Sequence, residues 1–250
     1  MPPLGLHMTV AREIAGELAS RAIEADRGAY YLGATTPDIR VLTRWDRERT
    51  HFFTLDDFNE QSGVHRLFEL EPALRDAAGV DASTAAFVAG YISHLVMDEA
   101  YICQIYRPLF GERSTLGGDV MANLMDRLLQ FELDRRDRED FDRIAEIQRE
   151  LAASAVEISV EFIAHDTLLE WRKVSAEVLN HPPTWDRFGR IASRHLSAAG
   201  IEGDDGLARF MEDVPSLLER TIEHVGTERI REYLDSSKAQ ARRAMKEYLS

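Results

Sequence analysis

The sequence predicts an all-α protein, and three observations support this prediction. Apolar residues recur at helical spacing along almost the whole chain, whereas the two-residue alternation typical of strands is nearly absent. Breaks rich in proline or glycine divide the chain into segments of helical length. With 250 residues, of which 44% are hydrophobic, the chain can form one substantial core. We therefore expect a single all-helical domain over residues 1–250.

The first part of the chain is predicted to combine helices with one long loop. A helix is expected over about residues 9–25, with Thr9 as a suitable N-cap. Residues 28–51 are expected to be irregular, because Thr36 precedes a proline and is sterically pushed towards extended geometry. Two short helices should follow, at about 55–61 and 64–78.

A long central helix is predicted next. It should be capped by Asp81 or Ser83 and should run past Asp98 to about Tyr106. Its residues between 85 and 97 are mostly small or apolar, so we expect this helix to be buried on most sides.

Residues 117–250 are expected to add further helices after a loop over 111–118. The mixed-charge run 133–140 is interpreted as a solvated surface stretch. Beyond a helix from about 119, the apolar pattern predicts helices at about 141–163, 167–179, 185–198, 206–224 and 228–249.

Composition limits the classes of function. The formal net charge of −14 would repel nucleic-acid backbones and anionic membranes, so binding of extended nucleic acid is not expected. The single cysteine excludes an internal disulfide framework and a thiolate-rich zinc site. No signal peptide is visible, and the apolar stretches are shorter than a membrane span. We expect a soluble, cytoplasmic protein.

One pair of residues on the central helix points to metal binding. His94 and Asp98 are four residues apart, which places both side chains on one face of the helix. Imidazole and carboxylate are ligands that zinc accepts. An aspartate in a nearly apolar stretch is costly to bury without a cation or a strong partner. We therefore predict that both residues are metal ligands.

Further candidate ligands lie upstream. Asp38 and His51 are ligand-type side chains among small or apolar residues, and His7 lies between two apolar residues just before the first helix. Glu99, next to Asp98 but turned by about 100° around the helix, could support the ligands or be exposed. His165, at a predicted helix end, is a further candidate supporting residue.

The order of these motifs resembles that of the bacterial zinc-dependent phospholipase C family. The resemblance covers about residues 6–106, the metal-binding half. It rests on the segments Leu6-His7-Met8, Tyr31-Leu32-Gly33-Ala34-Thr35-Thr36-Pro37-Asp38-Ile39, Thr50-His51-Phe52 and Gly90-Tyr91-Ile92-Ser93-His94 with Asp98. It implies an all-helical fold, related to that of secreted zinc nucleases, built around a buried metal site.

The resemblance also implies a ligand set and a chemistry. Asp38, His51, His94 and Asp98 would surround one metal, with Asp98 able to bridge to a second metal held partly by His7. The implied activity is hydrolysis of a phosphoric ester by metal-activated water, with Asp38 as a general base. Zinc is the expected metal, as one or two ions, and iron or manganese would also suit such ligands.

The chain departs from the family pattern beyond Asp98, where the further histidines of three-metal members are missing. Three alternatives therefore stay open: a hydrolase of small phosphoric esters, a non-catalytic metal-binding scaffold or interaction protein, and a metal-free polar cluster. The C-terminal helix, at about 228–249, could pack on the core or on a second subunit as a homodimer.

Overall fold

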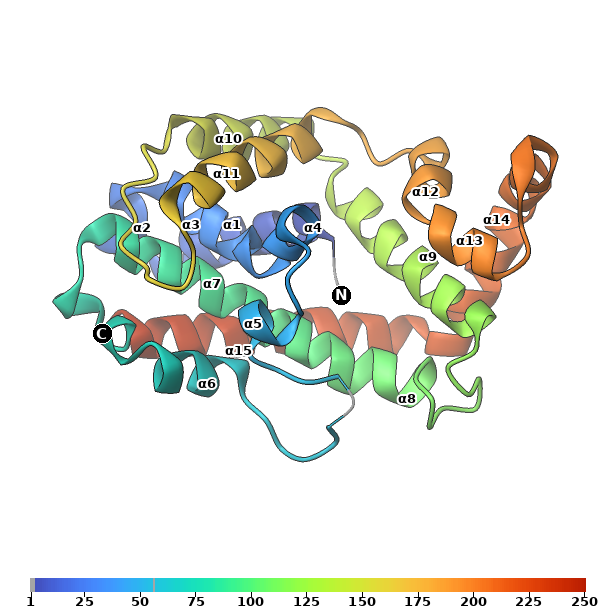
Figure 1. Ribbon diagram of the computed structural model, residues 1–250, viewed down its shortest axis with the longest axis horizontal. Helices are drawn as coiled ribbons and strands as arrows, with labels where there is room; N and C mark the ends of the chain where they lie inside the picture. Colours follow the sequence, from blue (N-terminus) through green and yellow to red (C-terminus); the bar gives the residue numbers. More distant parts are fainter. Residues whose placement is uncertain (1–2, 56) are drawn as a thin grey trace.

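The computed structural model describes residues 3–55 and 57–250, and these form helices and loops without a strand. The all-α prediction is confirmed. The helices, seen in Figure 1, are α1 (Leu4–Leu18), α2 (Arg21–Ala25), α3 (Arg27–Thr35), α4 (Arg40–Thr43), α5 (Glu48–His51), α6 (Gly63–Leu70), α7 (Ala82–Tyr101), α8 (Arg107–Leu109), α9 (Val120–Asp137), α10 (Phe141–Ala153), α11 (His165–Asn180), α12 (Trp185–Ile191), α13 (Ser193–Ala198), α14 (Gly203–Val225) and α15 (Thr227–Tyr248).

Helix α7 is the central helix that the sequence predicts. Asp81 caps its N-terminus by accepting a hydrogen bond from the Thr84 backbone N–H, and a π-helical turn, Ile102–Tyr106, continues it. It packs against α3 on one side and α15 on the other (Figure 1). Most of its residues are buried, as expected for a helix with apolar residues on nearly every face.

Two glycines let α3 and α7 approach each other closely. A Cβ on Gly33 would clash with the Phe87 carbonyl, and a Cβ on Gly90 would clash with the Tyr30 carbonyl. Each glycine thus faces the backbone of the other helix. This close packing brings Ala34 beside His94, which matters for the candidate site.

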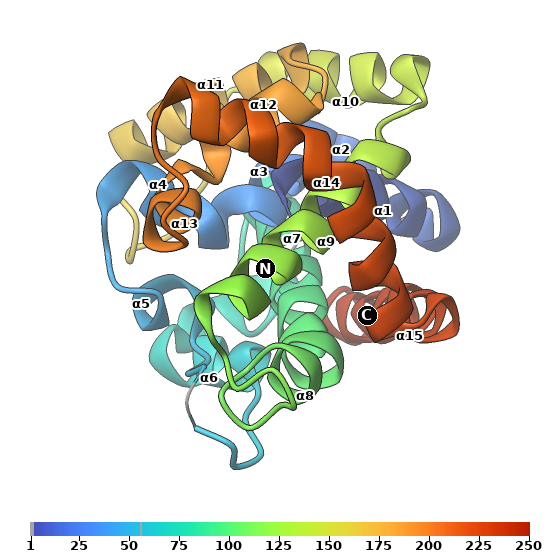
Figure 2. The same cartoon turned by 90° about the vertical axis from the view of Figure 1, so that its right-hand side faces the viewer.

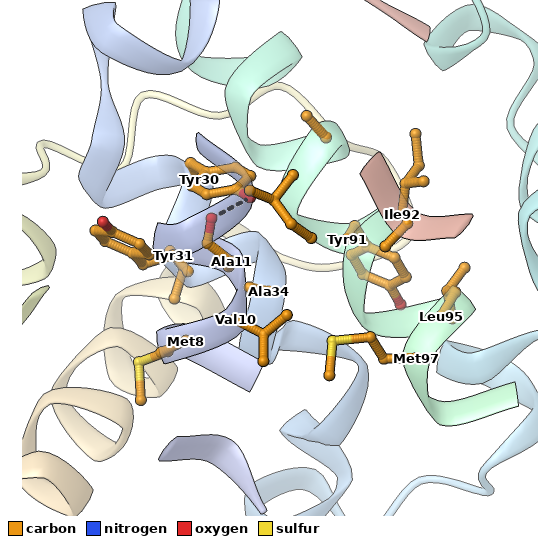
Figure 3. Close-up of a cluster of buried hydrophobic side chains, with 14 of the residues drawn as sticks. Met8, Val10, Ala11, Tyr30, Tyr31, Ala34, Tyr91, Ile92, Leu95 and Met97 are labelled. Atoms are coloured by element: carbon orange, nitrogen blue, oxygen red, sulfur yellow. Dashed lines mark hydrogen bonds between the residues drawn. The ribbon is translucent and has the colours of Figure 1, made fainter. Parts of the chain in front are cut away.

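The main core surrounds these two helices. Figure 3 shows side chains of α1, α3 and α7 meeting there, with the buried Tyr30 hydroxyl donating a 2.8 Å hydrogen bond to the Ala11 carbonyl. Residues of α10, α11 and α15 complete this cluster, including Leu151, Trp171 and Met245.

A second, smaller apolar cluster lies where α12, α13 and α14 meet α9, at one end of the molecule (Figures 1 and 2). Leu124, Leu128 and Phe131 of α9 face this cluster, whereas Leu129 and Leu133 of the same helix belong to the main core. Helix α9 therefore connects the two. None of the described helices has the combined length and hydropathy of a membrane span.

Several expected elements differ from the structure. Helix α1 begins at Leu4, so Thr9 lies inside it and is fully buried instead of capping it. The expected loop over 28–51 is largely helical, and the described residues of 55–61 form no helix. Thr36, for which the sequence predicts extended backbone before Pro37, instead has helical angles (φ −63°, ψ −30°), and Pro37 lies in the first turn of a 3₁₀ helix, Thr36–Ile39, where proline is tolerated.

The interpretation of 133–140 as a solvated stretch is wrong for two of its charged residues. Asp134 and Arg138 are buried and form an ion pair at 3.2 Å. The Asp134 carboxylate also accepts a 2.8 Å hydrogen bond from the Leu6 backbone N–H. Buried charges need such partners. A mixed-charge run does not show which of its residues will face the protein interior.

Candidate metal centre

Five of the predicted site residues come together in the interior. His7 comes from α1, Asp38 from the turn after α3, His51 from the end of α5, and His94 and Asp98 from α7. Ligand atoms of His7, His94 and Asp98 lie within 4.8 Å of one another, and the same holds for Asp38, His51 and His94. His94 belongs to both groups.

Helix α7 and its partner α3 fix the orientation of His94. Its Nδ1 lies 2.8 Å from the Ala34 carbonyl oxygen, which can only accept a hydrogen bond. The proton therefore sits on Nδ1, and the lone pair of Nε2 points into the site. A backbone carbonyl in this role is common behind metal-binding histidines.

His51 is held by a comparable chain of hydrogen bonds. The Thr50 hydroxyl donates to the Pro37 carbonyl at 2.7 Å and lies 3.3 Å from His51 Nδ1. Because that hydroxyl already donates its proton, it can accept a hydrogen bond from Nδ1, and His51 Nε2 faces the carboxylates of Asp38 and Asp98 at 3.5 and 3.9 Å. The Tyr91 hydroxyl, which donates to the Thr50 carbonyl at 2.5 Å, anchors the same turn to α7.

The polar atoms of the site have few partners. Among the described residues, no hydrogen-bond partner exists for the buried atoms Nδ1 and Nε2 of His7, Oδ1 of Asp38, Nε2 of His51, Nε2 of His94 and Oδ1 of Asp98. His7 stacks on His94 with ring centroids 3.7 Å apart. Buried polar atoms are rarely left unpaired, so this convergence is the pattern expected of a cation site.

The charge states of the imidazoles suit such a site. Burial outweighs the opposing effect of Asp38 and lowers the pKa of His94 to about 4. Burial and the neighbouring His94 lower the pKa of His7 well below its ordinary value. Both rings are therefore neutral near pH 7, which is the form that binds a metal.

The two carboxylates stay ionised. Burial by itself would raise the pKa of Asp98, but the Arg47 guanidinium and His51 hold it below its usual range. The pKa of Asp38 is likewise lowered, against the effect of burial, by His51, whose Nε2 lies 3.5 Å from Asp38 Oδ1. Neutral imidazoles and ionised carboxylates fit a divalent cation such as zinc.

Arg47 is a residue of this site that the sequence did not indicate. Its side chain is buried and forms an ion pair with Asp98 Oδ2, which also lies 3.9 Å from His51 Nε2, while Asp98 Oδ1 has no hydrogen bond from the described residues. In the sequence, Arg47 is one of several charged residues in a polar run, so no signal separates it from its neighbours.

The two candidate supporting residues lie elsewhere. Glu99 is half-buried and accepts a 3.0 Å hydrogen bond from the Gly63 backbone N–H, so it anchors the start of α6. His165 is exposed at the start of α11, in a shallow pocket with Asp81 and Glu157. The structure does not bring His165 to the cluster.

The comparisons with known proteins agree with the motif pattern. Residues 6–99 match the family model described as zinc dependent phospholipase C. Neither a curated protein nor a solved structure matches the chain. The matched segment contains all of His7, Asp38, His51, His94 and Asp98. The segment that supplies the candidate ligands is thus similar to the zinc-dependent phospholipase C family.

Proposed function

We propose that this protein is a metal-dependent hydrolase of phosphoric esters. The observation that carries the proposal is the convergence of unpaired, buried ligand atoms from four separate parts of the chain. His94, His51, Asp38 and Asp98 would hold one zinc ion, and His7 would help to hold a second if one binds. Bound zinc supplies Lewis acidity, which activates water near neutral pH and offsets charge on phosphoryl oxygens.

The remaining steps fall to side chains of the protein. Asp38 is the candidate general base, because its carboxylate lies both in the histidine cluster and in the lining of an adjacent cavity of about 430 Å³. A substrate in that cavity would therefore meet Asp38. Arg47 holds the Asp98 carboxylate in place and balances part of the negative charge of the site.

A non-catalytic metal-binding scaffold is the second candidate. The ion pair between Arg47 and Asp98 favours this alternative. The guanidinium contacts a carboxylate oxygen that Asp98 would need in order to bridge two metal ions. Under this alternative the protein binds metal but does not turn over phosphoric esters. The homodimer and the cytoplasmic location expected from the sequence stay predictions.

The test is hydrolysis of a generic phosphomonoester and phosphodiester by the zinc-loaded protein, before and after chelation. We expect turnover that chelation abolishes and added zinc restores. Asp38→Asn should lower kcat at least about 100-fold, as for loss of a general base, whereas Asp46→Asn, at an exposed neighbouring position, should not. Metal binding without turnover under zinc, iron or manganese would favour the scaffold instead.

A further inference from the structure

The cavity beside Asp38 has a lining that differs from the candidate metal centre. It is formed largely by residues outside the family match, from α9 and from the segment that includes α12 and α13 (Figure 2). Its volume of about 430 Å³ lies in the range of small-molecule sites. Phe131 and Phe188, with ring centroids 5.2 Å apart, provide an apolar wall.

One pair of charges in the lining is already satisfied. Arg138 pairs with Asp134 at 3.2 Å and also donates to the carbonyl oxygens of Val178 and His181 at 3.0 and 2.8 Å. These contacts tie α9 to the end of α11, so we assign this pair to the scaffold. It adds no net charge to the cavity.

Two other arginines of the lining have no carboxylate partner in the part of the chain that the structure describes. Arg127 donates one hydrogen bond, 3.2 Å long, to Gln130 Oε1, and within the described residues neither Arg127 nor Arg187 forms an ion pair. The lining contains three arginines, Arg127, Arg138 and Arg187, but only two aspartates, Asp38 and Asp134, so positive charge is in excess here. An anion in the cavity would offset this excess.

Neighbouring residues hold Arg127 in position and add a polar atom. The Gln130 amide donates to Asp126 at 2.7 Å, and the Tyr101 hydroxyl donates to the same carboxylate at 2.7 Å, so Gln130 is fixed. His195, also in the lining, has a buried Nδ1 without a hydrogen-bond partner among the described residues. The cavity thus presents arginine and histidine nitrogens beside an aromatic wall.

We infer that this cavity binds an organic phosphoric ester that carries a second anionic group, which Arg127 and Arg187 receive while the ester group lies near Asp38. This inference rests on the proposed function, because it specifies where the second anionic group of the proposed substrate would bind. The apolar body of the substrate would pack on Phe131 and Phe188. Arginine suits this role, since its guanidinium is always charged and binds carboxylate or phosphate oxygens in pairs.

The test measures binding, so that it does not depend on turnover. The probe is 4-phosphonobenzoate, a non-hydrolysable analogue with two anionic groups, titrated calorimetrically into the purified protein. A double variant with Arg127→Gln and Arg187→Gln should bind it at least about tenfold more weakly than the wild type, the effect expected when charged hydrogen bonds are lost. Arg209→Gln, exposed on α14 and outside the lining, is the matched control and should bind nearly normally.

A check of the fold and a charge-preserving variant complete the experiment. Circular dichroism and thermal unfolding of each variant check the fold, and Arg187→Lys, which keeps the charge, should retain most of the affinity. Equal binding by the double variant and the wild type would overturn the inference, as would an absence of binding to the wild type. If no metal is bound and no ester is hydrolysed, yet the arginine variants still lose affinity, the hydrolase proposal fails while the anion site stands.

Discussion

At the residue scale, the candidate centre combines imidazoles with ionised carboxylates, and hydrogen-bonding groups outside the site orient two of its three histidines. His94 is oriented by a carbonyl of α3, and His51 by a hydroxyl that is itself fixed on the Pro37 carbonyl. Hydrogen-bond partners behind a histidine set the tautomer and direction of the ring before any metal binds. The spacing of His94 and Asp98 could be predicted from the sequence, but these partners could not, because they join segments far apart in the chain.

Removal of Arg47 tests its role in balancing Asp98. Arg47→Met leaves a buried carboxylate without its ion pair, which should lower the free energy of unfolding by about 3 kcal/mol in chelated protein. Arg66→Met, which breaks an exposed pair with Glu69, should cost about 0.5 kcal/mol or less. Urea unfolding of both variants measures the difference, and equal losses would contradict this role.

The pKa of Asp137 predicts a dependence of stability on pH. Burial, aided by Glu13 and Asp134 and opposed by Arg143, raises the pKa of Asp137 from 3.8 to about 6. The folded state thus binds more protons than the unfolded state between these values. The contribution of Asp137 to stability is complete below about pH 4 and is lost as the pH rises to about 6.

The variant Asp137→Asn isolates this contribution. Its free energy of unfolding should vary less with pH between about 4 and 6 than that of the wild type, when both are measured by urea unfolding at several pH values. Parallel pH profiles for the two proteins would show that Asp137 has an ordinary pKa.

At the element scale, the all-helical fold and the central helix could be predicted from the sequence. The path of the chain around Pro37 could not. Proline disfavours helical backbone at Thr36, yet Thr36 has helical angles within a 3₁₀ turn, and the chain then continues as α4 and α5. Local sequence favours a loop here. Tertiary contacts, such as the hydrogen bond from the Tyr91 hydroxyl to the Thr50 carbonyl, stabilise the compact path that local propensity does not indicate.

The close crossing of α3 and α7 can be tested with one glycine. Gly90→Ala would place a methyl group against the Tyr30 carbonyl, so the helices must separate and the bond from His94 to Ala34 should lengthen. We expect a loss of about 2 kcal/mol in stability and weaker zinc binding. Thermal unfolding and zinc titration measure the two effects.

Gly16→Ala is the matched control for this substitution. Gly16 lies in α1, and a Cβ there would meet no atom within 4 Å. Alanine is the better helix former, so this variant should be more stable by about 0.5 kcal/mol. If Gly90→Ala were equally well tolerated, the close approach of α3 and α7 would not be required.

At the scale of the whole molecule, α9 joins the main core to the smaller apolar cluster. Because this helix contributes to both apolar clusters, we propose that the chain unfolds as one cooperative unit. Differential scanning calorimetry should show one transition whose calorimetric and van't Hoff enthalpies agree. Two resolved transitions would instead identify the cluster around α12, α13 and α14 as a separate domain.

The packing of the later helices against the part of the chain with the candidate ligands could not be predicted from the sequence. The motifs identified the half that carries the candidate ligands, but nothing in the pattern of α9 indicated that Arg127 would reach a cavity lined also by Asp38. Such a site depends on how helices pack across the molecule. Charged residues at half-buried positions, unlike apolar stripes, leave no periodic signal in the sequence.

The metal content of the purified protein shows whether the buried cluster binds metal. His94 belongs to both groups of candidate ligands, whereas His65 is exposed with its side chain 69% accessible. Elemental analysis should find about one or two zinc ions per wild-type chain and per His65→Ala chain, and almost none in a folded His94→Ala variant. Equal metal content in wild type and His94→Ala, or a metal-free wild type after growth and purification with zinc, would contradict the account.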